Sequence, residues 1–260
     1  MDTAGLGISR LKMNAVFWSS GEAWENLVAL CDGIGTRFAG TRGERQAAEF
    51  LLEKVSTYGL ENPHLEEFSY PGWTRGAPAS LEVLEPEGEK LECISLPRCP
   101  QATVEGELVN LGFGLAEDFE ARSERLPGKV ALIMAGAPPF YGRGVHRQEK
   151  LERALAAGAV GMIWRNNEGG YLLPTGSLSR GAPFAAPCVG VAREDGAYLE
   201  RRAEGGRVRV RISTYDESGP AVGWNVVAEL RGTVEPDAFI IAGAHYDCHD
   251  ICPGAADNGS

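Results

Sequence analysis

The segment Asp237–Ala244, with the sequence DAFIIAGA, is nearly all apolar and leads directly into His245. An apolar run of this length between turn residues is typical of a strand buried on both faces, as in the sheets of α/β proteins. The segment Gly223–Leu230 predicts a strand before it, with a turn at Gly232–Pro236. The chain is therefore expected to contain an α/β domain whose central strand ends at His245.

Residues that suit metal binding follow this predicted strand. His245 and Asp247 stand at its carboxyl end, and a turn at Cys252–Gly254 leads to Asp257 and Asn258. Because ligands of open α/β sheets bind beyond the carboxyl ends of strands, His245 and Asp257 are expected to enter one crevice from successive loops. Imidazole and carboxylate are standard zinc ligands, and Asp247 is placed to orient the imidazole. A structural histidine that is merely hydrogen-bonded at a strand end is the alternative interpretation.

Helix signals dominate the first part of the chain. Apolar residues recur at helical spacing over Glu22–Cys31, with Ser20 as the expected N-cap and Gly33 as the expected stop. Farther along, the sequence TRGE from Thr41 fits a capping box before a second helix, which Gly59 should end. A strand over residues 65–70, closed by a Pro-Gly pair, is expected next.

Residues 74–215 are rich in short predicted strands and are punctuated by Gly and Pro. Arg207, Arg209 and Arg211 alternate with apolar residues, which indicates a strand with one wet face. Helices are expected near 148–157 and 195–203. Strands are expected at 80–84, 90–94, 107–111, 129–134, 160–164 and 207–212. We therefore divide the chain into residues 1–73, a compact β-rich domain at 74–215, and residues 216–260.

Charge and hydropathy exclude some classes of partner. The formal net charge is −11, and an acidic chain repels phosphate backbones, so no nucleic-acid partner is expected. The sequence has no apolar run of about 18 residues, so no membrane partner is expected either. The start of the chain lacks a basic segment followed by an apolar core, which favours the cytoplasm, while secretion stays open.

The cysteines are scattered, and free buried thiols are the expected state in a chain of this size. A Cys93–Cys99 bridge in an oxidising compartment is the alternative. The sequence CHDIC from Cys248 offers three crowded ligands, fewer than a closed structural zinc site needs. The six positions are Cys31, Cys93, Cys99, Cys188, Cys248 and Cys252.

With the sequence GAADNGS after the HxD motif, the chain resembles the co-catalytic two-zinc exopeptidases, which include aminopeptidase Y and plasma glutamate carboxypeptidase. Their signature is an apolar strand, GAHxD, a short Gly/Pro loop and GAxDNxSG. Here the motifs span Gly243–Asp247 and Gly254–Ser260. The segments CDGIGTRFAGTRG and GWNVVAEL look like other peptidase parts. LPGKVALIMAG, AAGAVGMIW and APCVGVAREDG look like a protease-associated (PA) domain, which PGWTRG would begin.

The resemblance implies a truncated three-layer α/β zinc-exopeptidase fold with an inserted β-rich PA domain. It implies that His245 ligates one Zn²⁺, that Asp257 bridges two, and that Asp247 is the catalytic-site residue that holds the imidazole. Two such ions lower the pKa of a shared water and polarise the scissile carbonyl of a peptide substrate. A glutamate would act as general base.

This chain departs from the family pattern after DNxSG. The general base and three further ligands would follow there, and the sequence has no residues at those positions. The upstream pair Glu66-Glu67 is not a substitute, and His64 and His146 are interpreted as surface loop residues. We expect a zinc-dependent aminopeptidase-type metallopeptidase by ancestry, with weak or absent zinc binding and no activity of this chain alone. Its peptidase part should be marginally stable, whereas the PA part should fold alone.

Two other hypotheses remain open at this point. The chain could be a non-catalytic PA-domain module that binds a protein partner or covers a substrate. It could also be a different hydrolase that shares only a strand ending in HxD. The oligomeric state is not predicted.

Overall fold

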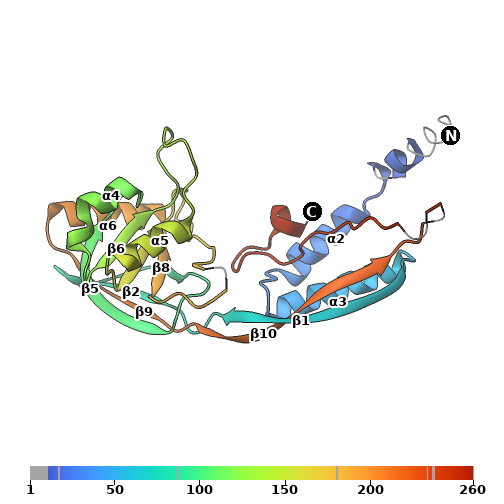
Figure 1. Ribbon diagram of the computed structural model, residues 1–260, viewed down its shortest axis with the longest axis horizontal. Helices are drawn as coiled ribbons and strands as arrows, with labels where there is room; N and C mark the ends of the chain where they lie inside the picture. The colour runs from blue at the N-terminus through green and yellow to red at the C-terminus, as the bar shows by residue number, and fades with distance from the viewer. Residues whose placement is uncertain are drawn as a thin grey trace. The chain divides into compact units, whose positions relative to one another are not determined.

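The computed structural model describes residues 11–16, 18–86, 88–179, 181–232, 234–235 and 238–259 (Figure 1). Contacts divide the chain into two compact units. Unit 1 consists of Met1–Glu67 and Trp224–Ser260, and unit 2 consists of Phe68–Gly223. The candidate metal-binding residues all belong to unit 1, so the two units are described separately.

Both helical segments predicted for unit 1 are present. Helix α2 (Glu22–Val28) continues into a π-helix, η1 (Ala29–Ile34), so the helical stretch passes the expected stop at Gly33 and ends before Gly35, which has a φ of 84°. The N-cap is Gly21 and not Ser20, although the Ser20 hydroxyl accepts a hydrogen bond from the Glu22 amide at 3.2 Å. Ser20 therefore still satisfies one of the orphan donors of the first turn.

Helix α3 (Arg42–Thr57) begins and ends where its local signals predict. The Thr41 hydroxyl caps it by accepting from the Glu44 amide at 3.4 Å. The reciprocal half of the capping box differs, because the Glu44 carboxylate accepts from the Gly40 amide at 3.4 Å. Gly59 follows the helix with a φ of 74°, the left-handed conformation expected of a terminating glycine.

Strands β1 (Glu61–Thr74) and β10 (Glu217–Glu229) form a two-stranded sheet, and each contributes residues to both units (Figure 1). The predicted strand at 223–230 is confirmed in β10. The prediction that Pro71-Gly72 closes the earlier strand is wrong, because β1 runs through both residues. Pro71 is tolerated since both strands of this sheet are edges. A Cβ on Gly72 would lie 2.3 Å from the Ala221 Cβ, so the close approach requires glycine there.

The predicted central strand at Asp237–Ala244 is not formed. Asp237 lies outside the described residues, and residues 238–244 have no regular secondary structure. Phe239, Ile240 and Ile241 are 83%, 98% and 83% exposed. A strand forms only when neighbouring backbone pairs with it, and no described residue pairs with this segment. Residues 238–244 therefore have the apolar composition of a buried strand, but no described strand or helix buries them.

Unit 2 is built on one eight-stranded sheet with the order β3-β2-β9-β5-β6-β7-β8-β4 in the described residues. Strands β5 to β8 run parallel to one another, and the remaining pairs are antiparallel. The predicted strand at 90–94 is split between opposite edges, and β8 was not predicted as a strand. The strands are β2 (Ser80–Glu85), β3 (Glu89–Leu91), β4 (Ile94–Ser95), β5 (Ala102–Asn110), β6 (Val130–Met134), β7 (Gly161–Arg165), β8 (Cys188–Val191) and β9 (Arg209–Thr214).

Helices cover both faces of this sheet. The two predicted helices are confirmed as α5 (Arg147–Ala156) and α6 (Arg193–Gly205), whereas α4 (Ala116–Arg122) and the 3₁₀ turn η2 (Ser123–Arg125) were not predicted. Alternate side chains of β6 point to opposite faces. Ala131 and Ile133 pack in one apolar cluster with Leu151 of α5, and Val130 and Leu132 pack in the other with Leu199 of α6. Unit 2 thus has a complete core of its own.

The wet face predicted for β9 is confirmed by its ion pairs. Val208, Val210 and Ile212 are buried, and the intervening arginines are partly exposed or exposed. Arg211 Nη1 lies 3.0 Å from a Glu82 oxygen, and Arg211 Nε donates to Glu105 at 2.8 Å. Exposed cross-strand pairs of this kind add little stability and mainly keep the face soluble.

All six cysteines are free, so the alternative Cys93–Cys99 bridge is not formed. Burial raises the pKa of Cys99 to about 11, which keeps that thiol neutral and unreactive at ordinary pH. Among the described residues, no helix is long and apolar enough to cross a membrane.

Candidate metal centre

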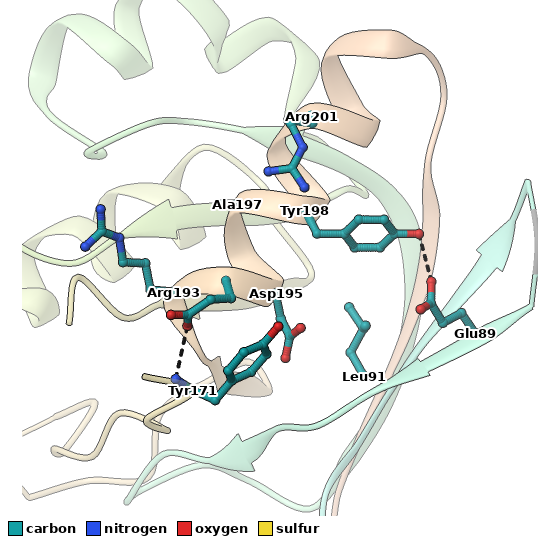
Figure 2. A pocket seen from close by; sticks show the side chains of 9 residues that line it. Glu89, Leu91, Tyr171, Arg193, Asp195, Ala197, Tyr198 and Arg201 are labelled. Carbon is teal, nitrogen blue, oxygen red and sulfur yellow. Dashed lines mark hydrogen bonds between the residues drawn. The ribbon is translucent and has the colours of Figure 1, made fainter. Parts of the chain in front are cut away.

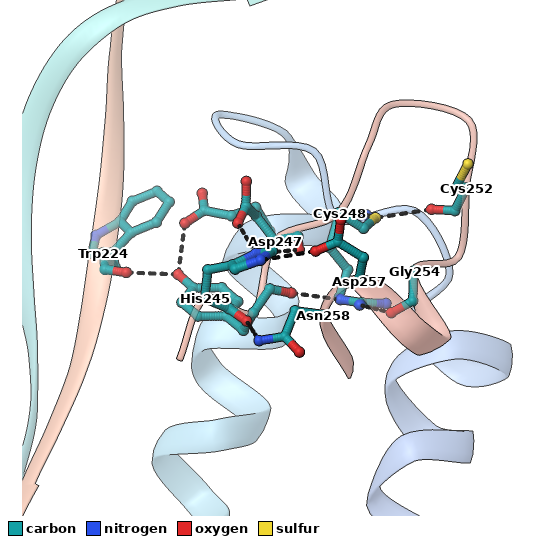
Figure 3. A network of polar contacts seen from close by, with 11 residues as sticks. Trp224, His245, Asp247, Cys248, Cys252, Gly254, Asp257 and Asn258 are labelled. Atoms are coloured by element: carbon teal, nitrogen blue, oxygen red, sulfur yellow. Dashed lines mark hydrogen bonds and ion pairs between the residues drawn. The ribbon is translucent and has the colours of Figure 1, made fainter. Parts of the chain in front are cut away.

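The structure brings together the three site residues that the sequence singled out (Figure 3). The Nδ1 atom of His245 lies 2.9 Å from Oδ1 of Asp247, and the Nε2 atom lies 3.0 Å from Oδ1 of Asp257. The side-chain amide of Asn258 donates to the His245 carbonyl at 3.0 Å. One imidazole therefore joins the HxD loop to the ADN segment through both of its nitrogens.

The two carboxylates set the charge state of the imidazole. Burial lowers the pKa of His245, but the hydrogen bond and charge of Asp247, with the charge of Asp257, outweigh it and raise the pKa above its ordinary value. The side chains of His245 and Asp257 are 55% and 77% exposed, so water screens these contacts. These exposed contacts therefore add little to the stability of the fold, and their strength depends on pH and on ions.

The donor atoms fit part of a zinc site. A hydrogen bond from Nδ1 to Asp247 leaves Nε2, which faces Asp257, as the nitrogen that would bind a metal once deprotonated, the usual arrangement of a ligating histidine. Two ligands about 2.0–2.1 Å from one tetrahedral zinc lie about 3.3 Å apart, close to the 3.0 Å between Nε2 and Oδ1. Zinc sites use at least three protein ligands, and no group of three His, Cys, Asp or Glu residues suited to a metal occurs among the described residues.

The loop that carries these residues is held by the first turn of α3. The Tyr246 hydroxyl donates to Glu44 Oε1 at 2.6 Å and lies 2.7 Å from the Trp224 carbonyl oxygen. Burial, with the charge of Glu44, raises the pKa of Tyr246, so the phenol stays protonated as a donor. The Arg45 guanidinium lies over the Trp224 ring, 4.5 Å from its centre, and so contacts the same residue as Tyr246.

Sequence reasoning missed two residues that position this loop. Glu44 was interpreted only as part of a capping box, yet it is 4% exposed and also binds Tyr246. Arg37 is fully buried and donates to the Tyr246 carbonyl within the HxD motif and to the Gly254 carbonyl at the start of the GAADN segment. The segment CDGIGTRFAGTRG, which resembles part of a peptidase family, contains Arg37 and ends one residue before Glu44, and nothing in its local pattern indicates these contacts.

The interpretation of CHDIC as a separate zinc site gains no support. The Cys248 thiol is 4% exposed, donates to the Cys252 carbonyl at 2.9 Å and accepts from the Arg37 amide at 2.9 Å. Burial raises the pKa of Cys248, which opposes the thiolate form that binds zinc. This cysteine is therefore a packing residue of the loop.

The remaining histidines do not join the candidate centre. His64 lies in strand β1 and not in a loop, and its ring contacts the Asn62 carbonyl at 2.7 Å and Glu66 at 3.6 Å. His146 caps helix α5 by accepting from the Gln148 amide at 3.2 Å. The prediction of a loop residue is therefore wrong for His64, whereas His146 lies just before α5.

Unit 2 has a hollow of about 550 Å³ beside α6 (Figure 2). Tyr198 donates to Glu89 at 2.8 Å on one side, and Glu194 accepts from the amides of Gly170 and Tyr171 on the other. Burial and neighbouring carboxylates raise the pKa of Asp195 within it. Its lining contains no histidine or cysteine, so it offers none of the nitrogen or sulfur ligands of a zinc site.

Comparison with known proteins follows the two units. Residues 104–199 match the PA domain family, and residues 225–260 match Peptidase family M28. The chain is 30% identical to aminopeptidase YwaD of Bacillus subtilis over 92% of this chain and 48% of that protein. It is 27% identical to carboxypeptidase Q of Bos taurus over 91% of this chain and 51% of that protein. The chain spans about half the length of the curated relatives it matches.

A solved structure is similar over most of the chain. The zinc aminopeptidase BSAP from Bacillus subtilis superposes with a TM-score of 0.69 and 25% identity, covering 91% of this chain and 53% of that one. The similarity therefore extends through both units and includes the segment with the three candidate residues.

Proposed function

This chain is homologous to zinc aminopeptidases of peptidase family M28, and on that premise we propose that it contributes to a zinc-dependent aminopeptidase-type metallopeptidase, which hydrolyses N-terminal peptide bonds. The observation that supports this most is the position of His245 Nε2, 3.0 Å from Asp257 Oδ1 with Asp247 bonded to Nδ1. The substrate is proposed to be a peptide with a free amino terminus.

Each of the three residues has one role in this proposal. His245 would hold a zinc ion through Nε2, and the Asp257 carboxylate would be the second ligand group. Asp247 accepts the Nδ1 proton, which fixes the tautomer and raises the basicity of the ligating nitrogen. When bound, two zinc ions activate a water and polarise the scissile carbonyl. Asn258 holds the His245 carbonyl and keeps the two segments together.

The chain alone is proposed to have no peptidase activity. Its described residues provide two of the proposed ligands, and the family resemblance places the general base and the other ligands after the DNxSG motif. Because catalytic groups act as a unit, a partial set does not leave a proportional part of the rate. Zinc binding through two ligands is proposed to be weak.

Residues 74–215 are proposed to form an inserted PA domain. The PA match at 104–199 and the two complete apolar clusters of unit 2 support this assignment. Such a domain should fold without the peptidase segments, and expression of residues 74–215 with a cooperative melt would support it. A molten, uncooperative product would contradict it.

Zinc titration of the whole chain by calorimetry tests the metal assignment. We expect weak binding that His245→Ala abolishes and that His64→Ala leaves unchanged, since His64 is an exposed histidine of the same unit. Equal heats for the wild type and His245→Ala would refute the assignment.

Hydrolysis of leucine p-nitroanilide with added zinc should not be detected. Turnover that His245→Ala removes would show that the proposal of an inactive chain is wrong.

A further inference from the structure

Arg37 joins the two backbone segments that carry the candidate ligands. We propose that Arg37 is a positioning residue that sets the spacing between His245 and Asp257, an inference that rests on the proposed function. Its guanidinium donates from Nε to the Tyr246 carbonyl at 2.8 Å and from Nη2 to the Gly254 carbonyl at 3.1 Å. Tyr246 lies directly between His245 and Asp247, and Gly254 begins the GAADN segment.

Further contacts fasten the same guanidinium to the N-terminal helices. Nη1 lies within hydrogen-bond distance of the Pro253 carbonyl at 2.5 Å, the Gly35 carbonyl at 3.0 Å and the Leu30 carbonyl at 3.1 Å. The backbone of Arg37 is also engaged, since its amide donates to the Cys248 thiol and its carbonyl accepts from the Cys248 amide at 3.3 Å. The residue thus ties the end of η1 to both sides of the candidate centre.

The burial of this charge needs an explanation that packing alone does not give. The Arg37 side chain is 0% exposed, and its hydrogen bonds within the described part of the chain go to backbone carbonyls and, at 4.0 Å, to the Cys31 thiol, and not to a carboxylate. A buried cation without a counter-ion is costly unless its donors are satisfied. Five donors in a rigid plane meet this need, and a lysine ammonium cannot span the same set of carbonyls.

The surrounding backbone is shaped to accept the guanidinium. Gly254 has a φ of 65°, and a Cβ there would lie 2.3 Å from the Cys248 Cβ and 3.1 Å from Arg37 Nη2. Gly43 makes a similar close approach on the other side, because a Cβ would lie 2.0 Å from the Thr36 carbonyl oxygen. The segment that presents Arg37 is therefore pressed onto α3, and the loop of Gly254 is pressed onto Arg37.

The ligand side chains depend on this backbone support. His245 and Asp257 are 55% and 77% exposed, so their own packing restrains them little. Their separation follows from the positions of the two loops, which the guanidinium connects through the carbonyls of Tyr246 and Gly254. Loss of the guanidinium should let the loops move apart without removing a ligand.

The experiment compares Arg37→Met and Arg37→Lys with the matched control Arg42→Met, an exposed arginine at the start of α3. In the metal-free chain, amide exchange of Cys248 and Cys252 should be about tenfold faster or more in Arg37→Met. Arg37→Lys should recover only part of the protection, and Arg42→Met should match the wild type. In parallel, Co²⁺ titration followed by visible absorption should show affinity weakened by about 10-fold or more in Arg37→Met, the range seen when groups supporting a ligand are removed.

The outcomes separate this inference from the proposed function. Unchanged exchange and unchanged Co²⁺ affinity in Arg37→Met would overturn the inference and leave the proposed function intact. If Co²⁺ binding to the wild-type chain does not depend on His245, the result counts against the proposed function. The amide-exchange measurement would still decide whether Arg37 holds the loops. If α3 amides also lose protection in Arg37→Met, that variant is unfolded in unit 1. In that case Arg37→Lys provides the test. Wild-type amide exchange and wild-type Co²⁺ affinity in Arg37→Lys would contradict the need for a planar guanidinium.

Discussion

The Nε2 atom of His245 lies 3.0 Å from Oδ1 of Asp257, although His245 lies in a loop, Asp257 lies in the short helical segment η3 (Ala255–Gly259) and both are largely exposed. Asp247 occupies the other ring nitrogen at 2.9 Å. Each ring nitrogen of the imidazole therefore faces a carboxylate, and the pairing of Nε2 with Asp257 is the arrangement from which metal binding is inferred.

Replacement of Asp247 by Asn should lower the pKa of His245. Although burial opposes it, the Asp247 carboxylate raises this pKa in the wild type, so its neutralisation should return the value toward 6.5. The measurement is an NMR titration of the imidazole. Asp32→Asn, which removes an exposed charge from the same unit, should leave the pKa unchanged. An unchanged pKa in Asp247→Asn would contradict the hydrogen-bond assignment.

The same pKa gives opposite pH dependences for stability and for zinc binding. Without metal, the raised pKa of His245 contributes stability below pH 6.5, and this contribution is lost as the pH rises through the folded-state pKa. A protonated Nε2 cannot bind a metal, so zinc affinity should fall as the pH drops through that value. Zinc titrations at a series of pH values check this, and an affinity independent of pH would exclude His245 as a ligand.

Gly43→Ala should destabilise unit 1 by about 1–3 kcal/mol, because overpacking against rigid backbone has this cost. The added methyl would lie 2.0 Å from the Thr36 carbonyl oxygen. Amide exchange of Ala47 and Ala48 in α3 measures the free energy of opening. Gly33→Ala is the matched control, since a Cβ there meets nothing within 4 Å. Equal effects of the two substitutions would show that the close approach is not real.

Lys150 should make the stability of unit 2 depend on pH above neutrality. Its side chain is fully buried, and burial lowers its pKa from 10.5 to about 8. The unfolded chain then binds more protons between pH 8 and 10.5, so the free energy of unfolding should rise with pH in that window, by at most about 3 kcal/mol. Urea unfolding of the wild type and Lys150→Met checks this, and parallel pH profiles would contradict it. Lys129→Met, at a partly buried ion pair with Glu107, serves as the control.

Thermolysin should cleave before Ile240 and Ile241 earlier than anywhere in β6. Residues 238–244 pair with no described strand and are almost fully exposed, whereas Ile133 of β6 is completely buried. Cleavage requires local opening, which costs nothing in an unpaired segment and nearly the global stability in a central strand. Mass spectrometry of early fragments identifies the sites. Equal resistance of both segments would indicate that 238–244 is covered.

Local signals predicted the helices well because the groups that define a helix end lie within a few residues of it. The Thr41 hydroxyl contacts the Glu44 amide, and Gly59 supplies the left-handed residue after α3. Strands depend on distant partners, and although most predicted strands are present, the errors at 238–244 and β8 concern such partners. Residues 238–244 have the right composition but no neighbour, and β8 is too short to show a period of its own.

The candidate metal centre, too, was predicted where its residues are close in sequence and missed where they are distant. His245, Asp247 and Asp257 lie in one short motif, so their chemistry and spacing were visible in the sequence. Arg37 and Glu44 contact Tyr246 from positions 209 and 202 residues away, and only the folded chain reveals that they support the motif. A buried arginine and a capping glutamate have no sequence signature that separates them from surface residues.

A crystal structure of the chain with zinc, located by anomalous scattering, tests the central claim most directly. The account predicts a zinc ion about 2.0–2.2 Å from both His245 Nε2 and Asp257, with Asp247 still bonded to Nδ1. Zinc bound instead by Cys248, His249 and Cys252, or His245 and Asp257 directed away from each other with no shared ion, would contradict it.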